Sequence, residues 1–598
     1  MDRTPILYTV LPAHPAAHRF EVRCTVDLPD PVGQRFALPA WIPGSYLIRD
    51  FARNIVSIRA EAGGKPVALE KLDKHTWQAA ALKHPTALTV VVEVYAWDLS
   101  VRGAHFDETH AFFNGTSVFL RVIGQEESPC HVDIQPPAGE RYKDWRVATA
   151  MNPVQAAGDK RGKARRHGFG LYGAENYDEL IDHPVEMGRF SHATFEACGV
   201  PHEIVITGRH DCDMSRLCRD LKRICEWQIR FFGEPAPMSR YVFLVTAVGS
   251  GYGGLEHRAS TALLCSRNDL PYAGMTGLPE GYRTFLGLCS HEYFHTWNVK
   301  RIKPAAFTPC DLERENYTTL LWAFEGFTSY YDDLALLRSG AIERKDWLEL
   351  MGKTISNVLR TPGRLKQSLA ESSFDAWSKF YRPDENTPNA VVSYYAKGAL
   401  FALALDLTLR AKTDGRVALD DVMRALWEKH GKTGVGVDED DIREIAEGCS
   451  GLKLKRLFVE GVSGTRDLPL KKLLAPLGVD LSLETAPAAK TPSLGIKTNG
   501  DNGANEIRLA TVFDGGAAQT AGLAAGDALL AVDGLRVTPT TLDQLLARHQ
   551  PGDTVHIHAF RRDELMEFTV RLDPPPEDNA RLAIREGAYP LRKQWLGG

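Results

Sequence analysis

The spacing of apolar residues changes twice along this chain, and these changes constrain the fold more than any single motif. In residues 1–175 apolar side chains alternate with polar ones or run together in short stretches, such as ALTVVVEVYAW and TSVFLRVIG. Turn residues, including Gly63-Gly64 and Asn114-Gly115, separate these stretches. Short apolar stretches between turns are typical of strands. The pattern predicts an N-terminal β-sandwich.

Helical spacing replaces this pattern from about residue 189. The run Tyr241–Val248 still predicts a strand, but residues 281–299, 316–339 and 390–410 carry apolar side chains three and four positions apart. That spacing indicates amphipathic helices. Near residue 468 the pattern changes back. An Ala/Pro-rich segment, residues 484–492, reads as a linker and precedes short strands with Gly-rich turns.

The chain length fits this division, because 598 residues are too many for one hydrophobic core. We expect a multidomain α+β protein. Its predicted parts are a β-sandwich domain over residues 1–175, a mainly helical domain over 176–466, a β-rich module with its lead-in over 467–575, and a C-terminal tail over 576–598.

Charge and composition argue against several classes of function. The net charge of −5 is small for this length, so neither a nucleic acid nor a membrane is expected as partner. The basic segment Gly158–His167 is expected to be a solvated loop. The first apolar run is too short for a signal peptide, and no apolar run is long enough to cross a membrane. Ten scattered cysteines indicate free thiols and a cytoplasmic protein.

The sequence SHEYFHTWNVK, which begins at Ser290, contains a potential metal site. On a helix His291 and His295 share one face, so their rings can reach a single ion. Glu292 lies about 100° round the helix, where it can take a proton from a metal-activated water. Asn298 and Arg301 follow this helix. They can orient a ligand, or they can serve as capping and salt-bridge residues.

A catalytic zinc ion needs a third protein ligand and an open position. The helix expected over residues 316–339 contains WAFEGF, in which Glu325 is an acidic residue among apolar ones. An isolated buried carboxylate is costly unless it is paired or bound to a metal. We therefore predict His291, His295 and Glu325 as ligands of one zinc ion per chain.

These motifs together resemble a known family. HEYFHTW followed by WAFEGF is similar to the gluzincin metallopeptidases, and most similar to the glycyl aminopeptidases, relatives of aminopeptidase N with a C-terminal PDZ domain. The run WIPGSYLIRDFARNI, Trp41–Ile55, supports the same resemblance. The resemblance covers nearly the whole chain. It implies a thermolysin-like zinc peptidase domain and a preference for small N-terminal residues such as Gly and Ala.

The resemblance also implies substrate-binding residues. Gly253-Gly254-Leu255-Glu256-His257 matches a Gly-x-Met-Glu-Asn strand motif, in which the Glu binds the α-amine of the substrate. Glu256 is thus the expected amine anchor, beside Gly253 and Gly254, although Leu255 and His257 depart from the motif. His257 itself suits either a hydrogen bond near the site or a structural role.

A later motif supplies the expected oxyanion donor. Ser393-Tyr-Tyr-Ala-Lys-Gly398 matches a Tyr-x-Lys-Gly context, with Tyr395 in the catalytic register and Tyr394 as the alternative. A phenol is neutral at pH 7 and can donate a hydrogen bond to developing negative charge. Lys397 and Gly398 are expected to help pack the helix.

The C-terminal module resembles a PDZ domain. Ser493-Leu494-Gly495-Ile496 matches its carboxylate-binding loop, and residues 541–548 match the helix beside which a bound peptide lies. Two roles are compatible with this match. The module can capture the C-terminus of a peptide or protein, or it can serve only to pack on the catalytic domain.

The predicted function is a zinc aminopeptidase that acts on peptides with a free N-terminus. Glu292 is the general base for a zinc-activated water, Tyr395 stabilises the oxyanion and Glu256 holds the ammonium. One alternative is a zinc endopeptidase that receives substrates from the PDZ module, which needs a cleft open at both ends. The other is a non-enzymatic PDZ adaptor on an inactive peptidase fold.

Overall fold

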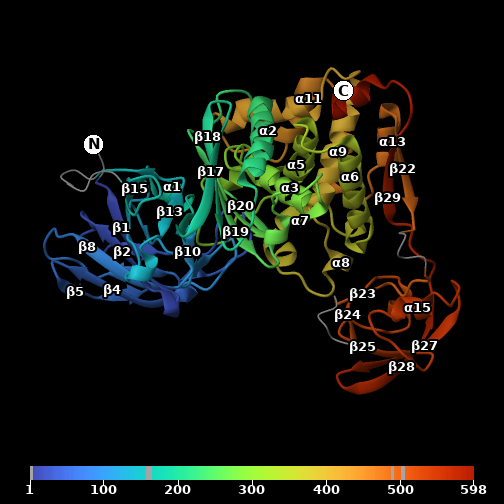
Figure 1. Cartoon of the computed structure of the whole chain (residues 1–598), viewed down its shortest axis with the longest axis horizontal. Coiled ribbons are helices and arrows are strands. Elements are labelled where there is room, and N and C mark those ends of the chain that lie inside the picture. The colour runs from blue at the N-terminus through green and yellow to red at the C-terminus, as the bar shows by residue number, and fades with distance from the viewer. Residues whose placement is uncertain (1–3, 156–163, 486–490, 500–505, 598) are drawn as a thin grey trace. The chain divides into compact units, whose positions relative to one another are not determined.

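The computed structural model describes residues 4–155, 164–485, 491–499 and 506–597 (Figure 1). Parts of the basic loop and of the linker expected from the sequence, residues 158–163 and 486–490, lie outside these ranges. The chain divides into two compact units. The first comprises residues 1–316, 338–342 and 427–436, and the second comprises residues 317–337, 343–426 and 437–598.

Three sheets form the N-terminal part of the first unit. The largest has the order β14 (Asn152–Pro153), β15 (Gly170–Ala174), β12 (Cys130–Ile134), β1 (Ile6–His14), β2 (Arg19–Val26), β8 (Leu88–Tyr95), β4 (Ile55–Ala62), β5 (Lys65–Val67). The second is β13 (Arg146–Thr149), β16 (Val185–Gly188), β10 (His110–Phe113), β9 (Ala104–Phe106), and the third is β11 (Arg121–Val122), β3 (Arg35–Ala37), β7 (Thr76–Ala79), β6 (Leu69–Lys71).

The alternation in the sequence explains these strands. In β1 the side chains of Ile6, Tyr8 and Val10 are buried, and the residues between them are more exposed. The stretch TSVFLRVIG, by contrast, contains only the two-residue strand β11, preceded by a 3-10 turn at Gly115–Ser117. It is buried almost throughout rather than on one face. An apolar run of this kind does not by itself distinguish a strand from a buried irregular segment.

A five-stranded sheet completes the first unit. Its order is β17 (Phe190–Ala197), β18 (Val200–Thr207), β19 (Tyr241–Val248), β21 (Ser260–Ser266), β20 (Tyr252–Glu256). β20 pairs antiparallel with β21 and forms an edge of the sheet. Helices α1 (Tyr177–Ile181), α2 (Met214–Phe232) and α3 (Glu280–Phe294) belong to the same unit. The edge strand β20 and helix α3 carry five of the predicted site residues, Gly253, Gly254, Glu256, His291 and Glu292.

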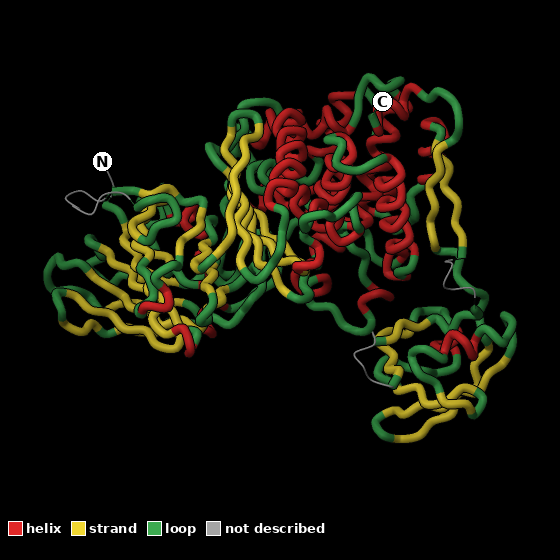
Figure 2. The backbone as a smooth tube through the Cα atoms, viewed as in Figure 1, coloured by secondary structure: helices red, strands yellow, loops and turns green. Residues whose placement is uncertain are grey.

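Helices dominate the first half of the second unit (Figure 2). They are α4 (Leu321–Phe324), α5 (Gly326–Arg338), α6 (Arg344–Leu359), α7 (Leu369–Phe374), α8 (Thr387–Ala390), α9 (Ala396–Lys412), α10 (Leu419–Leu426), α11 (Asp441–Ser450), α12 (Lys455–Phe458) and α13 (Leu470–Leu474). The helix expected over residues 316–339 is thus divided at Glu325 into α4 and α5.

The C-terminal sheet has the order β23 (Ile496–Thr498), β24 (Ile507–Val512), β25 (Ala528–Val532), β27 (Thr554–Arg561), β28 (Glu564–Arg571), with β26 (Leu535–Arg536) beside β25. Helices α14 (Ala517–Thr520) and α15 (Leu542–Leu546) contribute to its apolar core. Strand β22 (Val479–Glu484) precedes this module and pairs with β29 (Asn579–Ile584), which follows it. Helix α16 (Pro590–Leu596) comes after β29.

The segment after the module is attached to the helices of its unit. The Ala580 N–H donates to Ser356 Oγ at 2.8 Å on α6, and Trp595 Nε1 donates to the Tyr330 hydroxyl at 2.9 Å on α5. The predicted fold class, a multidomain α+β protein with an N-terminal β-rich domain, a mainly helical domain and a C-terminal β-rich module, is confirmed. None of the helices that the structure describes combines the length and apolar character needed to span a bilayer.

Candidate active site

The two histidines of the metal motif lie at the C-terminal end of α3. His291 is in the last turn and His295 is the capping residue, and their ring centroids are 4.6 Å apart. His295 is buried, and its Nδ1 donates a hydrogen bond to the Asn298 carbonyl at 2.7 Å. That bond fixes the tautomer and leaves Nε2 of His295 as the nitrogen that can bind a metal. Asn298 thus orients His295 through its backbone.

Glu292 lies where α3 approaches the edge strand β20. Its side chain is buried, and a Cβ atom added to Gly254 would lie 2.0 Å from Glu292 Oε1. A larger residue at position 254 would therefore displace the carboxylate. This contact gives a physical reason for a glycine in the predicted substrate-binding strand.

Glu256 ends β20 close to Glu292. One ligand atom each from Glu256, Glu292 and His295 lies within 4.8 Å of the others, and all three residues are buried. Two buried carboxylates beside an imidazole make a strongly negative environment that favours a bound cation or ammonium group. The predicted amine anchor, the general base and one metal ligand thus come together within the first unit.

Gly44 covers the carboxylate of Glu256. A Cβ atom on Gly44, whose φ is +98°, would lie 2.6 Å from each carboxylate oxygen of Glu256. Gly44 belongs to the WIPGSY run, in which the Trp41 indole donates to the Asp311 carbonyl at 2.8 Å. In the sequence this run indicates only a family resemblance, and its position beside Glu256 was not predicted. A Pro-Gly pair indicates a tight turn, but nothing in the sequence says which residue that turn contacts.

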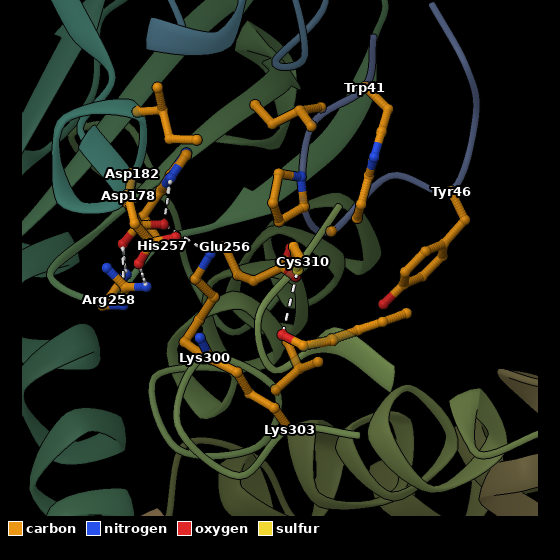
Figure 3. A pocket seen from close by; sticks show the side chains of 16 residues that line it. Trp41, Tyr46, Asp178, Asp182, Glu256, His257, Arg258, Lys300, Lys303 and Cys310 are labelled. Carbon is orange, nitrogen blue, oxygen red and sulfur yellow. Dashed lines mark hydrogen bonds and ion pairs between the residues drawn. The ribbon is translucent and has the colours of Figure 1, made fainter. Parts of the chain in front are cut away.

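A cavity of about 580 Å³ of empty volume adjoins Glu256 (Figure 3). Aromatic side chains, among them Trp41 and Tyr46, line one part of it, and charged side chains, among them Asp182 and Lys300, line another. The cavity therefore offers an apolar wall and a charged wall next to the expected amine anchor.

Asp182 organises the charged wall. Lys300 Nζ lies 2.7 Å from Asp182 Oδ1, the Arg258 N–H donates to Oδ2 at 2.9 Å, and His257 Nδ1 lies 3.4 Å from Oδ1. Burial raises the pKa of Asp182, but the charges of Lys300 and Arg258 and the His257 contact outweigh it and hold that pKa well below its usual range. His257 therefore contacts Asp182 rather than standing alone near the site.

Arg301 has a structural role. Its guanidinium donates to the carbonyls of Thr296 and Pro237, at 2.7 and 2.8 Å. These bonds tie the end of α3 to the segment before β19. Of the two roles that the sequence left open for Arg301, the structure shows the capping one.

Glu325 is buried at the junction of α4 and α5 in the second unit. A Cβ atom on the next residue, Gly326, would lie 2.5 Å from the Cα atom of Gly398, and one on Gly398 would lie 2.7 Å from the Trp322 carbonyl. The two glycines allow α5 and α9 to pack in backbone contact. Gly398 therefore helps pack α9, as expected. Glu325 directly precedes α5 and Tyr395 directly precedes α9, so both lie near this contact.

Tyr395 is the half-buried residue that precedes α9, and its hydroxyl lies 3.3 Å from the Tyr381 hydroxyl. Its neighbour Tyr394 is fully buried, and its ring packs against the rings of Phe380 and Tyr395. A catalytic phenol has to reach solvent or substrate, so the accessibility of the two rings favours Tyr395. Lys397 donates to the Arg364 carbonyl at 2.9 Å, and burial lowers its pKa to about 8.

The PDZ-like module has a groove between its first strand and its second helix. The predicted loop Ser493–Ile496 and residues of α15, including Leu542 and Leu546, line this groove. Gly495, at φ +70°, approaches the Cα atom of Gly516 closely, which shapes the loop. Next to this loop the module is bonded to α8, because the Asn389 side chain bonds to Val512 and Asp514 of the module, and Val512 pairs with Ile496. The module therefore has both an open groove and a packing surface.

Comparisons with known protein families agree with this architecture. The Peptidase M61 N-terminal domain matches residues 7–189, the M61 glycyl aminopeptidase domain matches residues 284–401, and the PDZ domain matches residues 477–572. The second match includes His291, Glu292, His295, Glu325 and Tyr395.

Known proteins are similar to this chain over its whole length or over a part of it. The crystal structure of an aminopeptidase N family protein from Idiomarina loihiensis shares 41% sequence identity, with a TM-score of 0.93, and the alignment covers 99% of this chain and 100% of that one. A serine protease Do-like HtrA from Lactobacillus helveticus is 30% identical over 145 residues, which are 23% of this chain and 34% of that protein. This chain thus matches only about a third of the length of that curated relative.

Proposed function

The chain belongs to the M61 glycyl aminopeptidase family and is a zinc-dependent aminopeptidase, and we propose that it releases small N-terminal residues, Gly and Ala, from peptides. The description of the matched family as glycyl aminopeptidases supports a preference for a small N-terminal side chain in the substrate. The observation that carries the proposal is the meeting of Glu256, Glu292 and His295 within 4.8 Å at the edge strand β20. An exopeptidase needs an anion for the substrate amine close to its general base, and this group supplies both.

The residues fit one zinc ion at the catalytic site of each chain. We assign His291, His295 and Glu325 as its ligands, a two-imidazole and one-carboxylate set that suits catalytic zinc. The carbonyl that orients His295 supports this assignment, because such a partner is typical of a metal-binding histidine. When bound, zinc supplies a Lewis acid that polarises the scissile carbonyl and makes water more acidic.

The remaining residues position the substrate and move protons. Glu256 accepts hydrogen bonds from the α-ammonium of the substrate, and the backbone of Gly253 and Gly254 leaves room for the chain beside β20. Glu292 takes a proton from the attacking water and passes it to the leaving amine. The Tyr395 hydroxyl donates a hydrogen bond to the developing oxyanion.

Hydrolysis of chromogenic amides tests this function. We expect the zinc-loaded protein to cleave glycyl and alanyl amides and to leave their N-acetylated forms intact. Equal cleavage of the acetylated forms would favour an endopeptidase. Cleavage of neither form, together with an absence of bound metal, would favour a PDZ adaptor.

We also propose that the groove of the PDZ module binds the C-terminal carboxylate of a peptide through the loop Ser493–Ile496. The groove lies between the loop Ser493–Ile496 and α15, the arrangement in which a PDZ domain holds an extended peptide. Fluorescence anisotropy of labelled peptides, with free and amidated C-termini, tests it. Equal binding of both peptide forms contradicts a carboxylate site.

A cytoplasmic location remains part of the proposal, supported by the free thiols of all ten cysteines.

A further inference from the structure

A cluster of metal-binding side chains lies in the N-terminal part of the first unit, apart from the residues assigned to catalysis. One ligand atom each from His105, Asp107 and His110 lies within 4.8 Å of the others. The residues come from the hairpin of β9 and β10, in the sequence HFDETH. We propose that this cluster is a second metal site, which binds a divalent first-row transition ion such as zinc.

The ligand types are those of a transition-metal site. Two imidazoles and one carboxylate leave open positions for water and suit zinc or its neighbours in the first row. His105 Nε2 and Asp107 Oδ2 are 3.4 Å apart. That spacing matches two donors that bind one ion tetrahedrally with bonds of about 2.1 Å, for which the separation is about 3.4 Å.

His105 has weak hydrogen bonding for a buried histidine. Only 5% of its surface is exposed, its Nδ1 has no hydrogen-bond partner, and its contact with Asp107 is long. A metal bond at Nε2, the nitrogen that faces Asp107, would replace this long hydrogen bond and leave Nδ1 as the N–H of the neutral ring.

His110 has the partner expected of a metal ligand. Its Nδ1 lies 3.1 Å from Glu186 Oε1 on the adjacent strand β16, and Glu186 also accepts a hydrogen bond from Thr207 at 3.0 Å. A carboxylate on one ring nitrogen fixes the tautomer and leaves Nε2 for the ion.

Asp107 is also held in place. Its Oδ1 accepts the N–H groups of Thr109 and His110, at 2.6 and 3.1 Å, so that Oδ2 is left toward His105. The Asp107 side chain is 27% exposed, which gives an ion a path from solvent. Among the described residues no lysine or arginine forms an ion pair with the three ligands or with Glu186.

A second group of this kind, His167, His192 and Glu203, is less suited to a metal. The two oxygens of Glu203 lie 2.7 Å from His167 and 2.7 Å from Arg166. Arg146 lies 3.2 Å from Nδ1 of His192. Two guanidinium groups already occupy the positions near the carboxylate and the imidazole, and their charges oppose a cation.

The position of the hairpin suggests what the ion would stabilise. Asn114, which follows β10, donates to the Val101 carbonyl at 2.7 Å. Val101 and Arg102, just before β9, are the nearest neighbours of a Cβ atom placed on Gly253. An ion that joins β9 to β10 would therefore stiffen the loop beside the substrate-binding strand.

The test measures bound zinc in the full chain after the proposed catalytic ligands have been removed. The starting protein carries His291→Ala and His295→Ala, and it is loaded with zinc, desalted and analysed for metal by mass spectrometry. We expect it to retain about one zinc per chain, because a site with three protein ligands binds tightly.

Added substitutions locate that ion. His105→Phe preserves the stacking of the ring against Trp97 and removes a ligand, and Asp107→Asn preserves the turn acceptor and removes the charge. Each is expected to reduce bound zinc at least about tenfold. His131→Ala, in β12, is the matched control and is expected to retain the ion.

Cobalt substitution gives an independent readout. The starting protein is expected to show the visible absorption of a bound Co²⁺ ion, which Asp107→Asn abolishes while circular dichroism shows an unchanged fold. If the starting protein retains no zinc, or if His105→Phe and Asp107→Asn both retain it, the hairpin is not a metal site.

Discussion

A Cβ atom placed on Gly44 would lie 2.6 Å from both carboxylate oxygens of Glu256, a residue 212 positions later in the chain. The glycine therefore allows a turn of the N-terminal domain to lie directly against the proposed amine anchor. This contact links the WIPGSY run, which shows no chemistry of its own, to the substrate site. It also suggests a substitution that moves Glu256 without changing it.

Gly44→Ala is expected to lower kcat/KM for a glycyl amide by at least about tenfold. The added methyl group displaces the carboxylate, and a displacement of about 1 Å at a positioning group can reduce a rate by about 100-fold. Gly64→Ala is the matched control, because Gly64 also has a positive φ, +74°, but no atom lies within 4 Å of its Cβ position. Similar activity losses in the two proteins would show backbone strain rather than displacement of Glu256.

Glu256→Ala tests the anchor itself. A buried charge that loses its partner costs about 2–5 kcal/mol, so kcat/KM for a free-amine substrate is expected to fall by at least about 30-fold. The acetylated substrate makes no such bond, so it is expected to stay intact with both proteins. Steady-state kinetics with the two substrates measures the difference. A variant that still discriminated fully between them would show that another group recognises the amine.

Glu292→Gln is expected to reduce kcat by about 100- to 10,000-fold, because the amide cannot accept a proton from water. Its size and shape are kept, so β20 still fits against α3. Metal analysis is expected to show zinc content equal to that of the wild type. Full activity in a protein with bound zinc would exclude Glu292 as the general base.

The parts of the fold that were predictable are those with local signals. The strand Tyr241–Val248 has the bounds expected from its apolar run, and α3 covers most of the helix expected around His291. The stretch TSVFLRVIG misled for a physical reason. A Cβ atom on Gly115, just before it, would lie 2.8 Å from the Cα atom of Ile181, so its beginning packs tightly against α1 and only Arg121–Val122 pairs in a sheet.

The site was predictable to a similar extent. Spacing alone predicts that His291, Glu292 and His295 lie on one helix, whose C-cap is His295, whereas Glu256 was predicted only through the family resemblance. The contact of Gly44 with Glu256 and the Lys300–Asp182 pair join residues more than 100 positions apart. No local pattern encodes such contacts, because they depend on how the domain packs as a whole.

Tyr395→Phe is expected to lower kcat by about 100- to 1,000-fold and to leave KM nearly unchanged, since its hydroxyl acts mainly on the developing oxyanion. Tyr394→Phe is the matched control. Tyr394 is fully buried, so we expect that change to affect stability more than catalysis. The reverse pattern of kcat values would assign the catalytic role to Tyr394.

Asp182→Asn is expected to lower the free energy of unfolding by about 3 kcal/mol at pH 7. The substitution leaves Lys300 buried without its counter-charge, and breaking a buried ion pair in this way costs about 3–5 kcal/mol. Asp144→Asn is the control, because its ion pair with Arg189 is exposed and contributes about 0–1 kcal/mol. Urea unfolding measures both.

The pH dependence of the same pair has a definite sign. The pKa of Asp182 in the folded protein lies well below its unfolded value of about 3.9, so the folded state favours the carboxylate. Its stabilising contribution is therefore complete above about pH 5 and is lost as the pH falls below about 4 toward the folded pKa. The wild type should lose more stability than Asp182→Asn between pH 5 and pH 3. Parallel stability curves for the two proteins over that range would show that Asp182 has no depressed pKa.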